Sequence, residues 1–462
     1  MVRRVFSGKP SDRSAIHTIR PERILALGFV LVIVLGTILL MLPISALNRQ
    51  SVGLHKALFT ATSAVCVTGL VVVDTGTTYT FFGRMIILAL IQVGGLGFMI
   101  FATLVMIALG RRISLRSRVL IRESMNTTGL SGLIRLIQWF TLMAFGFEML
   151  GAVVLSTRFI PLYGWGRGIE FAVFHAVSAF CNAGFDLFGG YQSLAGFYSD
   201  PVIVFTIMSL IVLGGLGFFV LLEMYQNRMR FQKFSLHTKL VLVITASLIL
   251  IGLFLILLFE WNNPDTLGGM TIFDKFMNGL FQSVTFRTAG YATINQATLT
   301  DSSKLIGIIL MFIGASPAST GGGVKTTTLG VLLLLVVSVV RANDSVVVFG
   351  KQIASNVFKR ALAIVLISML IIIICAISMS LAERNSHQKM IDLLFEATSA
   401  FGTVGLSSAN TQNLSVLSQM LLIPVMFFGR VGPLTLAFAL ANKMEHNAKN
   451  RLHFPEERPM IG

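Results

Sequence analysis

Charged residues are what this sequence has least of. Asp, Glu, Lys and Arg make up only 12% of its 462 residues, whereas soluble domains have about 25%. Hydrophobic residues make up 55%, and the mean hydropathy is +0.82. This composition argues against a soluble globular protein and indicates that lipid is the main solvent of the folded chain.

Cysteine is also scarce, with three residues at positions 66, 181 and 375. An odd number without paired spacing predicts no disulfide framework. No CxxC motif or Cys/His cluster is present, so the cysteines predict no metal site.

Acidic residues are few relative to basic ones, which gives a formal net charge of +16. In a soluble protein this excess would raise the question of nucleic acid. Here the basic residues gather in short segments between apolar runs, where the positive-inside rule explains them. No aromatic-basic face accompanies them, so we expect no nucleic-acid partner.

Long apolar runs replace the missing charge. Residues 24–42, 240–259 and 361–379 are each long enough to cross a bilayer, which takes roughly 20 residues. Apolar segments and loops together predict an all-α polytopic membrane protein with eight crossing helices. These are expected at residues 22–44, 84–109, 133–157, 201–227, 237–260, 303–340, 357–381 and 416–442.

Basic residues mark alternate loops between these helices. They follow the second and eighth helices and lie between the fourth and fifth and between the sixth and seventh. The intervening loops have fewer basic and more acidic residues. Both termini are therefore expected in the cytoplasm, as an N-terminal segment 1–21 and a tail 443–462.

Each of the other loops contains an apolar stretch that is too short to cross and ends near a glycine. The stretches are residues 60–70, 174–185, 281–291 and 395–406, and their glycines are Gly69, Gly184, Gly290 and Gly405. The glycines are 115, 106 and 115 positions apart (184 − 69, 290 − 184 and 405 − 290). Such internal repetition predicts four copies of helix, re-entrant loop and helix.

A second motif strengthens the repeat. It reads ValGlyGlyLeuGlyPhe at 93–98 and LeuGlyGlyLeuGlyPhe at 213–218, with related sequences at 313–319 and 428–433. The expected boundaries are residues 22–112 for repeat 1, 113–231 for repeat 2, 232–344 for repeat 3 and 345–442 for repeat 4.

Four re-entrant loops around a pseudo-fourfold axis would surround one central pore. Irregular backbone at membrane depth is tolerated where it is buried or lines a water-filled path. Rings of backbone carbonyl oxygens replace the hydration shell of K⁺, and glycine permits the conformation that this requires. A single such loop would be read as an ordinary turn, but four favour a cation filter. The candidate filter residues are Val67, Thr68, Gly69, Asn182, Ala183, Gly184, Thr288, Ala289, Gly290, Thr403, Val404 and Gly405.

The chain resembles the Trk/Ktr/HKT superfamily of potassium transporters along essentially its whole length. Residues 403–405 (Thr-Val-Gly) are similar to half of a potassium-channel filter, and the other three loops to the degraded filter of this family. In plant relatives, serine at the first loop glycine accompanies sodium permeation. Gly69 therefore implies, by resemblance, a K⁺-selective pathway.

The sixth predicted helix contains an irregular stretch, residues 314–328, with four glycines, a proline and one lysine. Proline and glycine are the weakest helix formers, so we expect an intramembrane loop below the filter. The resemblance implies that this loop gates the pore together with Arg430, since an intramembrane charge is a functional candidate. The candidate gate residues are Gly314, Ala315, Ser316, Pro317, Ala318, Ser319, Thr320, Gly321, Gly322, Gly323, Lys325 and Arg430.

Four charged residues leave alternatives open. Lys325 either opposes cations or caps the helix break or extends to the cytoplasmic face. Arg287, beside the third filter, is expected to point away from the pore, towards Glu396. Asp74 and Asp186 follow their filters and either attract cations or are ordinary solvated loop charges.

The sequence offers two rival functions. A nucleotide hydrolase is suggested by residues 321–326, but Val324 stands where a phosphate loop needs glycine, and no preceding strand is expected. We therefore expect no enzyme and no organic cofactor. The second rival is a Na⁺-coupled K⁺ symporter that uses the same pore, because the family is often sodium-dependent. Parallel repeats favour a channel-like path, since symporters often have inverted ones.

The resemblance also implies the subtype, the membrane and the partners of the protein. The chain is most similar to the Ktr type, since it shows no additional N-terminal pair of helices. It implies a homodimer in a bacterial cell membrane, docked on a cytoplasmic ring of RCK/KTN-type nucleotide-binding regulatory subunits. The transported ion is K⁺, and Na⁺ is a candidate activator. The basic loops would contact either this ring or anionic membrane lipid.

Overall fold

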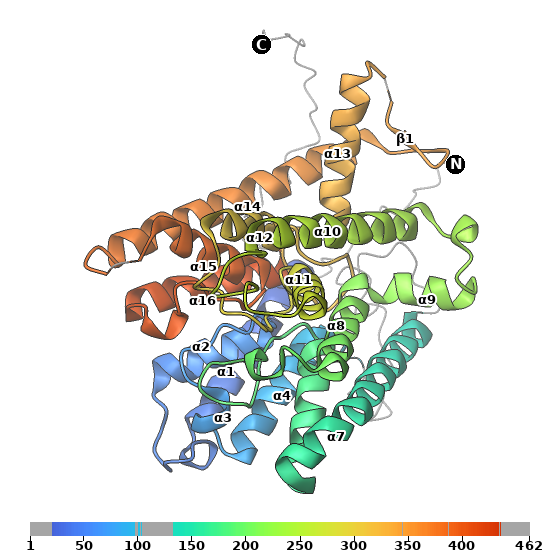
Figure 1. Cartoon of the computed structure of the whole chain (residues 1–462). Helices are drawn as coiled ribbons and strands as arrows, with labels where there is room; N and C mark the ends of the chain where they lie inside the picture. Colours follow the sequence, from blue (N-terminus) through green and yellow to red (C-terminus); the bar gives the residue numbers. More distant parts are fainter. Residues whose placement is uncertain are drawn as a thin grey trace, which may run out of the picture.

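The computed structural model describes residues 21–97, 100, 101, 103, 133–343, 345–386, 388–433 and 435. This part is built almost entirely of helices, arranged as shown in Figure 1. Its one strand pair is a short antiparallel hairpin, β1 (Val347–Val348) with β2 (Lys351–Gln352). The prediction of an all-α protein is confirmed.

Among the described residues, four helices are long and apolar enough to cross a membrane: α1 (Pro21–Met41), α7 (Leu133–Phe180), α10 (Leu236–Glu260) and α14 (Ser355–Ala382). Their outer faces carry exposed apolar side chains. On α14, Leu366, Leu370 and Ile374 are each more than half exposed and lie four residues apart on one face. A stripe of this kind is stable when lipid covers it, as expected of an integral membrane protein.

Four short segments, which we call the inner helices, pack against the helices around them. They are α2 (Leu54–Val65), the part of α7 after its kink at Gly164, α11 (Ile272–Thr285) and α15 (Met390–Gly402). α1 packs against α2, α10 against α11 and α14 against α15. Each inner helix has a fully buried phenylalanine at the same place in the repeat: Phe59, Phe174, Phe281 and Phe395.

Each inner helix is followed by a further helix whose first turn is capped in the same way. These are α4 (Phe81–Leu96), α8 (Pro201–Leu216), α12 (Asp301–Phe312) and α16 (Val416–Val431). In each, a side-chain oxygen before the first residue accepts a hydrogen bond from a free backbone N–H, which stabilises the helix start. The capping residues are Thr80, Asp200, Thr300 and Ser415.

The helices predicted as continuous over 84–109, 201–227 and 416–442 are in fact interrupted. α4, α8 and α16 end immediately before Gly97, Gly217 and Gly432, whose φ values are 88°, 92° and 93°. With ψ between 134° and 140°, this conformation is open essentially only to glycine. α9 (Phe218–Gln226) follows α8 at an angle of 95°.

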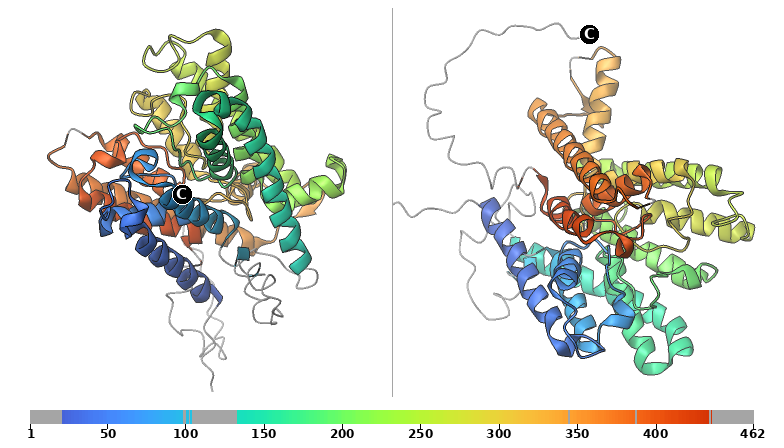
Figure 2. Two further views of the ribbon diagram at one scale, coloured as in Figure 1. Left: turned by 90° about the horizontal axis from the view of Figure 1, so that it is seen from below. Right: turned by 90° about the vertical axis from the view of Figure 1, so that its left-hand side faces the viewer.

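In the third copy the interruption is a loop. The chain leaves the helix after Phe312 and returns at α13 (Thr326–Val340), which projects from the helical body (Figures 1 and 2). Ile313 and Val324 pair in parallel across the base of this 313–325 loop. The irregular stretch expected over 314–328 is therefore shorter, because Thr326–Thr328 form the first turn of α13.

The remaining short helices lie in connections. They are α3 (Thr75–Thr78) and four 3₁₀ turns, η1 (Pro43–Ser45), η2 (Ala195–Phe197), η3 (Phe231–Lys233) and η4 (Thr411–Asn413). Several predictions lie outside the described residues: most of the N-terminal segment 1–21, the boundary between repeats 1 and 2 at 112/113, the ends of the spans 84–109 and 416–442, and the tail 443–462.

Candidate cation pathway

Three residues with one recurring backbone pattern follow each inner helix. We call residues 67–69, 182–184, 288–290 and 403–405 the glycine strips. Each strip begins with a left-handed residue, and φ is 57° at Val67, 58° at Asn182, 68° at Thr288 and 50° at Thr403. Each ends with a glycine of positive φ, between 68° and 92°. A positive φ is uncommon for a residue other than glycine, and all four strips have one at their first residue. The four copies therefore share an unusual backbone conformation.

The four strips adjoin one another in a closed order. A Cβ atom placed on Gly69 would collide with the carbonyl oxygen of Ala183, and one on Gly184 would approach Gly290 Cα at 2.7 Å. A Cβ on Gly290 would lie 2.5 Å from the Val404 carbonyl oxygen, and one on Gly405 would collide with that of Thr68. The ends of the four strips therefore form a ring in which each glycine lies beside its neighbour's backbone.

Hydroxyl groups from the inner helices hold the strips in two ways. The Ser63 and Ser399 hydroxyls accept hydrogen bonds from the N–H groups of Gly69 and Gly405, both at 3.1 Å. In the second and third copies the hydroxyl donates instead to the carbonyl that follows the glycine: Ser178 to Phe185 at 2.9 Å and Thr285 to Tyr291 at 2.5 Å.

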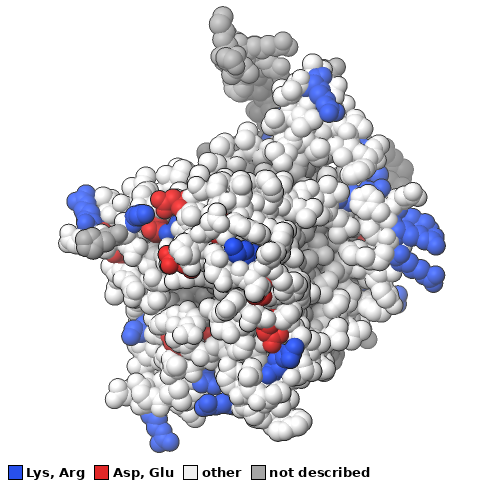
Figure 3. Space-filling view, viewed as in Figure 1, with Lys and Arg blue, Asp and Glu red and all other residues white. Residues whose placement is uncertain are grey.

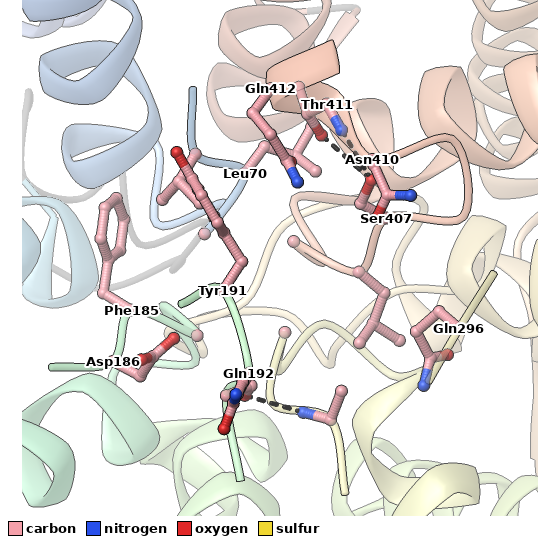
Figure 4. A pocket seen from close by; sticks show the side chains of 18 of the residues that line it. Leu70, Phe185, Asp186, Tyr191, Gln192, Gln296, Ser407, Asn410, Thr411 and Gln412 are labelled. Atoms are coloured by element: carbon pink, nitrogen blue, oxygen red, sulfur yellow. Dashed lines mark hydrogen bonds between the residues drawn. The ribbon is translucent and has the colours of Figure 1, made fainter. Parts of the chain in front are cut away.

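A cavity of about 410 Å³ lies over the ring. All four strip glycines line it, as do the residues that follow them. Segments from all four copies surround it in Figure 4, and several acidic groups lie around the hollow centre of the face in Figure 3. Most basic groups on that face lie nearer its edge. The cavity is therefore a vestibule with more acidic than basic groups near its opening.

Asp74 and Asp186 both line this vestibule. The Asp74 carboxylate accepts from the backbone N–H groups of Thr77 at 3.0 Å and Tyr191 at 3.3 Å. Asp186 accepts from Phe188 N–H at 3.1 Å, and burial, with a smaller contribution from nearby Asp74, raises its pKa to about 7. Both acids organise loop backbone, and Asp186 changes charge near neutral pH.

The 313–325 loop lies directly against the other end of the strips. Gly322 N–H donates to the Thr403 hydroxyl at 3.0 Å, and a Cβ on Gly321 would collide with the Thr288 hydroxyl. The loop is also bonded to the second copy, since the N–H groups of Ser316 and Thr320 donate to the carbonyls of Gly215 and Gly214 at 3.1 and 3.2 Å. It crosses the space below the ring and contacts repeats 2 and 4.

Arg430 joins three parts of the chain at this level. Its guanidinium donates to the carbonyl of Thr320 in the loop and to those of Gly94 and Gly95 in α4. Arg430 itself belongs to the last turn of α16. One cationic side chain thus links repeat 4 to the loop of repeat 3 and to the helix end of repeat 1.

A second cavity, of about 210 Å³, lies on the far side of the loop from the vestibule. Both Lys325 and Arg430 line it, together with apolar side chains such as Phe29 and Phe218. Lys325 is the residue before α13, and its ammonium donates to the Gly321 carbonyl at 2.8 Å. This bond lies within the loop and does not cap the free N–H groups of α13, because an ammonium only donates, and the charge of Lys325 faces the cavity.

The glycines of the second motif make close backbone contacts. A Cβ on Gly94, Gly214 or Gly429 would collide with the carbonyl oxygen of Val65, Phe180 or Phe401, each located four residues before a strip glycine. In the third copy, Gly314 lies in the same way against Gly322 of its own loop. These glycines therefore let the second helix of a copy approach the base of the strip.

The predicted pairing of Arg287 with Glu396 is wrong. Arg287 is 7% exposed and donates to the Thr245 hydroxyl in α10 at 3.4 Å. Glu396 is instead occupied by the hydroxyls of Ser407 and Thr411. The expectation that Arg287 ties elements together holds, but its partner is the outer helix of its own repeat.

A helical membrane protein with glycine-rich loops meeting at its centre has the features of a cation transporter. A family model described as "TrkH: Cation transport protein" matches residues 13–452. The chain belongs to this family of cation transport proteins, which confirms the predicted resemblance and the prediction that it is a transporter and not an enzyme.

Three comparisons with individual proteins agree. The chain is 41% identical to Ktr system potassium uptake protein B of Bacillus subtilis, covering 93% of this chain and 95% of that protein. It is 38% identical to potassium/sodium uptake protein NtpJ of Enterococcus hirae, covering 96% and 97%. The crystal structure of the potassium transporter TrkH from Vibrio parahaemolyticus shares its fold, with a TM-score of 0.69 and 18% identity over 93% of this chain and 87% of that one.

Proposed function

We propose that this chain is the K⁺-translocating membrane subunit of a bacterial potassium uptake system, with channel-like permeation through the ring of glycine strips. The observation that carries the proposal is the ring itself. Its four strips share one backbone pattern, and the glycine of each strip lies against the backbone of the next. A ring of backbone oxygens replaces the hydration shell of K⁺ without adding a fixed negative charge. The relatives that are named for potassium uptake support the choice of ion.

The architecture that we propose is four repeats around one pore, with eight crossing helices and four inner helices. The recurring phenylalanines, helix caps and strip conformations support four equivalent copies. The distribution of basic residues supports cytoplasmic termini in a bacterial cell membrane.

The gate that we propose is the 313–325 loop, closed in this conformation by Arg430. Supporting contacts run from the loop to the strips, to α8 and to Arg430, so the loop lies across the path between the two cavities. Two cationic groups on the inner side, Lys325 and Arg430, add an electrostatic barrier to K⁺.

The partners that we propose are a second copy of the chain and a cytoplasmic ring of nucleotide-binding regulatory subunits. The relative from Bacillus subtilis is named as part of a Ktr system, which supports partner components. A movement of the regulatory subunits would reach the 313–325 loop through α13. This helix continues from the loop and projects from the helical body.

A second candidate function is Na⁺-coupled K⁺ symport through the same pore. The relative named potassium/sodium uptake protein favours it. A coupled transporter would accumulate K⁺ against its own gradient when a Na⁺ gradient is imposed, whereas a channel-like path would not.

The test is K⁺ uptake in a bacterial strain that lacks its own uptake systems, with a regulatory subunit supplied. The wild-type chain is expected to restore growth at low K⁺, and deletion of residues 314–323 is expected to raise cation flux. Absence of uptake by the wild-type chain would contradict K⁺ conduction, and unchanged flux in the deletion would contradict the gate.

A further inference from the structure

One buried position recurs in all four inner helices but carries a different polar side chain in each. It follows the buried phenylalanine directly and is occupied by Thr60, His175, Gln282 and Glu396, none more than 1% exposed. Burying a polar group without a partner costs free energy, and a buried carboxylate costs most. Four different polar groups at one equivalent place therefore point to partners that each copy supplies.

In every copy the partner lies beyond the glycine strip of the same repeat. Glu396 accepts hydrogen bonds from the hydroxyls of Ser407 and Thr411. His175 accepts at Nε2 from the backbone N–H of Leu187 at 3.3 Å. Gln282 and Gln296 exchange two bonds, of 2.6 and 3.1 Å, and the Tyr79 hydroxyl donates to Thr60 at 3.4 Å.

These four connections differ in how closely they hold the strip. Ser407 is two residues after Gly405 (407 − 405), and Leu187 is three after Gly184 (187 − 184). Gln296 is six residues after its glycine (296 − 290) and Tyr79 is ten (79 − 69). His175 therefore holds a backbone N–H and Glu396 a serine hydroxyl close to the glycine, whereas Thr60 and Gln282 bond to side chains farther along the chain. Repeats 2 and 4 stand opposite each other in the order of the ring.

Both close connections come from rigid acceptors. His175 Nδ1 lies 2.7 Å from the Phe171 carbonyl, and Nε2 meets an N–H donor, so the ring is neutral with its proton on Nδ1. Its plane stacks on Phe188 with the ring centroids 4.3 Å apart. Glu396 reaches the vestibule rim, where Ser407 and Thr411 are joined to each other (Figure 4).

We propose that Glu396 and His175 are positioning residues that hold the outer ends of the opposed strips of repeats 4 and 2, and thereby set selectivity for K⁺ over Na⁺. The inference rests on the proposed function. The two ions differ in size and in the number of oxygens they require, so a ring discriminates between them only while its oxygens keep their spacing and orientation. Release of one outer end lets the strip adapt to the smaller ion.

The experiment measures uptake of Rb⁺ and of Na⁺ by purified full-length protein in liposomes, with KM and maximal rate for each. Glu396→Ala and His175→Phe are expected to lower the Rb⁺/Na⁺ ratio about tenfold, which is the size of one buried hydrogen bond. The KM for Rb⁺ should rise in these variants, while the maximal rate of Rb⁺ uptake should change little. His175→Gln should restore the ratio, because its amide oxygen again accepts from Leu187 N–H.

Thr60→Val is the matched control, since it removes a bond at the equivalent position that acts far from the strip. Its selectivity should stay near that of the wild type. Ser407→Ala tests the Glu396 connection from a partly exposed partner if alanine at 396 prevents folding, and it should lower the ratio as well. Wild-type selectivity in His175→Phe and Ser407→Ala, or an equal loss in Thr60→Val, overturns the proposal. Wild-type protein that does not distinguish Rb⁺ from Na⁺ would instead overturn the proposed function.

Discussion

Replacement of Arg430 by alanine is the perturbation that most directly tests the closed gate. The side chain makes one hydrogen bond to the loop, at the Thr320 carbonyl, and two to the end of α4. A hydrogen bond from a charged donor contributes about 1.5–3 kcal/mol. The variant removes one such bond from the loop, together with a cationic charge from the inner cavity.

The loop keeps its other anchors, which limits the effect. Ser316 and Thr320 remain bonded to α8, and Gly323 N–H donates to the Gly429 carbonyl at 3.3 Å. Because each 1.4 kcal/mol changes an equilibrium tenfold, we expect the open fraction to rise about 10- to 100-fold in Arg430→Ala. Arg430→Lys keeps the charge but cannot reach all three carbonyls, so its flux should fall between those of the alanine variant and the wild type.

The assay is uptake of labelled Rb⁺ into liposomes that contain equal amounts of each folded variant, without regulatory subunits. We expect the initial rate to be highest for the alanine variant, intermediate for the lysine variant and lowest for the wild type. An alanine variant that is folded and correctly inserted but takes up Rb⁺ no faster than the wild type would refute the proposed role of Arg430.

Three further predictions concern the ring and the vestibule. Gly290→Ala should abolish K⁺ flux, because its Cβ would lie 2.5 Å from the Val404 carbonyl oxygen. Gly269→Ala is the control, since a Cβ there meets no atom within 4 Å, and it should transport normally. The K⁺ uptake rates of the two variants test this. Gly69→Ser should admit Na⁺, as measured by Na⁺ uptake, since serine displaces the Ala183 carbonyl; retained K⁺ selectivity would count against the ring. Asp186 is charged above its pKa of about 7 and neutral below it, so KM for K⁺ should rise as the outer pH falls from 8 to 6, and Asp186→Asn should show the high KM at both values.

Much of the fold could be predicted because the sequence repeats itself. The glycines of the strips recur at nearly constant separation, and the structure brings all four together. A repeated motif reports equivalent positions even when no single loop is distinctive. The interruption of the helix in the third repeat could also be predicted, since the glycines and the proline in residues 314–323 disfavour a helix.

The breaks at Gly97, Gly217 and Gly432 were missed because apolar sequence continues through them. A helix interrupted at membrane depth needs partners for its free backbone groups. At α9 that partner is remote, since Phe218 N–H donates to the Ala318 carbonyl of the 313–325 loop. The three break glycines belong to the repeated second motif, but a contact partner 100 residues away (318 − 218) leaves no local signal that the helix ends there.

The positions of buried polar groups were also beyond sequence reasoning. The sequence suggested for Glu396 only a pairing with Arg287, and it gave His175 no role of its own. Comparing the four repeats column by column would have shown that both occupy one equivalent position, but their chemistry differs too much to reveal the shared role. Only the hydrogen bonds to Leu187 and Ser407, close to the strip glycines, identify it.

In the proposed function the four glycine strips form one K⁺ site. The most direct measurement is a structure of the protein in Rb⁺, with the ion located by its anomalous scattering, compared with one in Na⁺ alone. We expect Rb⁺ density on the axis between Gly69, Gly184, Gly290 and Gly405, and its loss in Gly290→Ala. Rb⁺ bound elsewhere in the protein, with none between the strips, would contradict it.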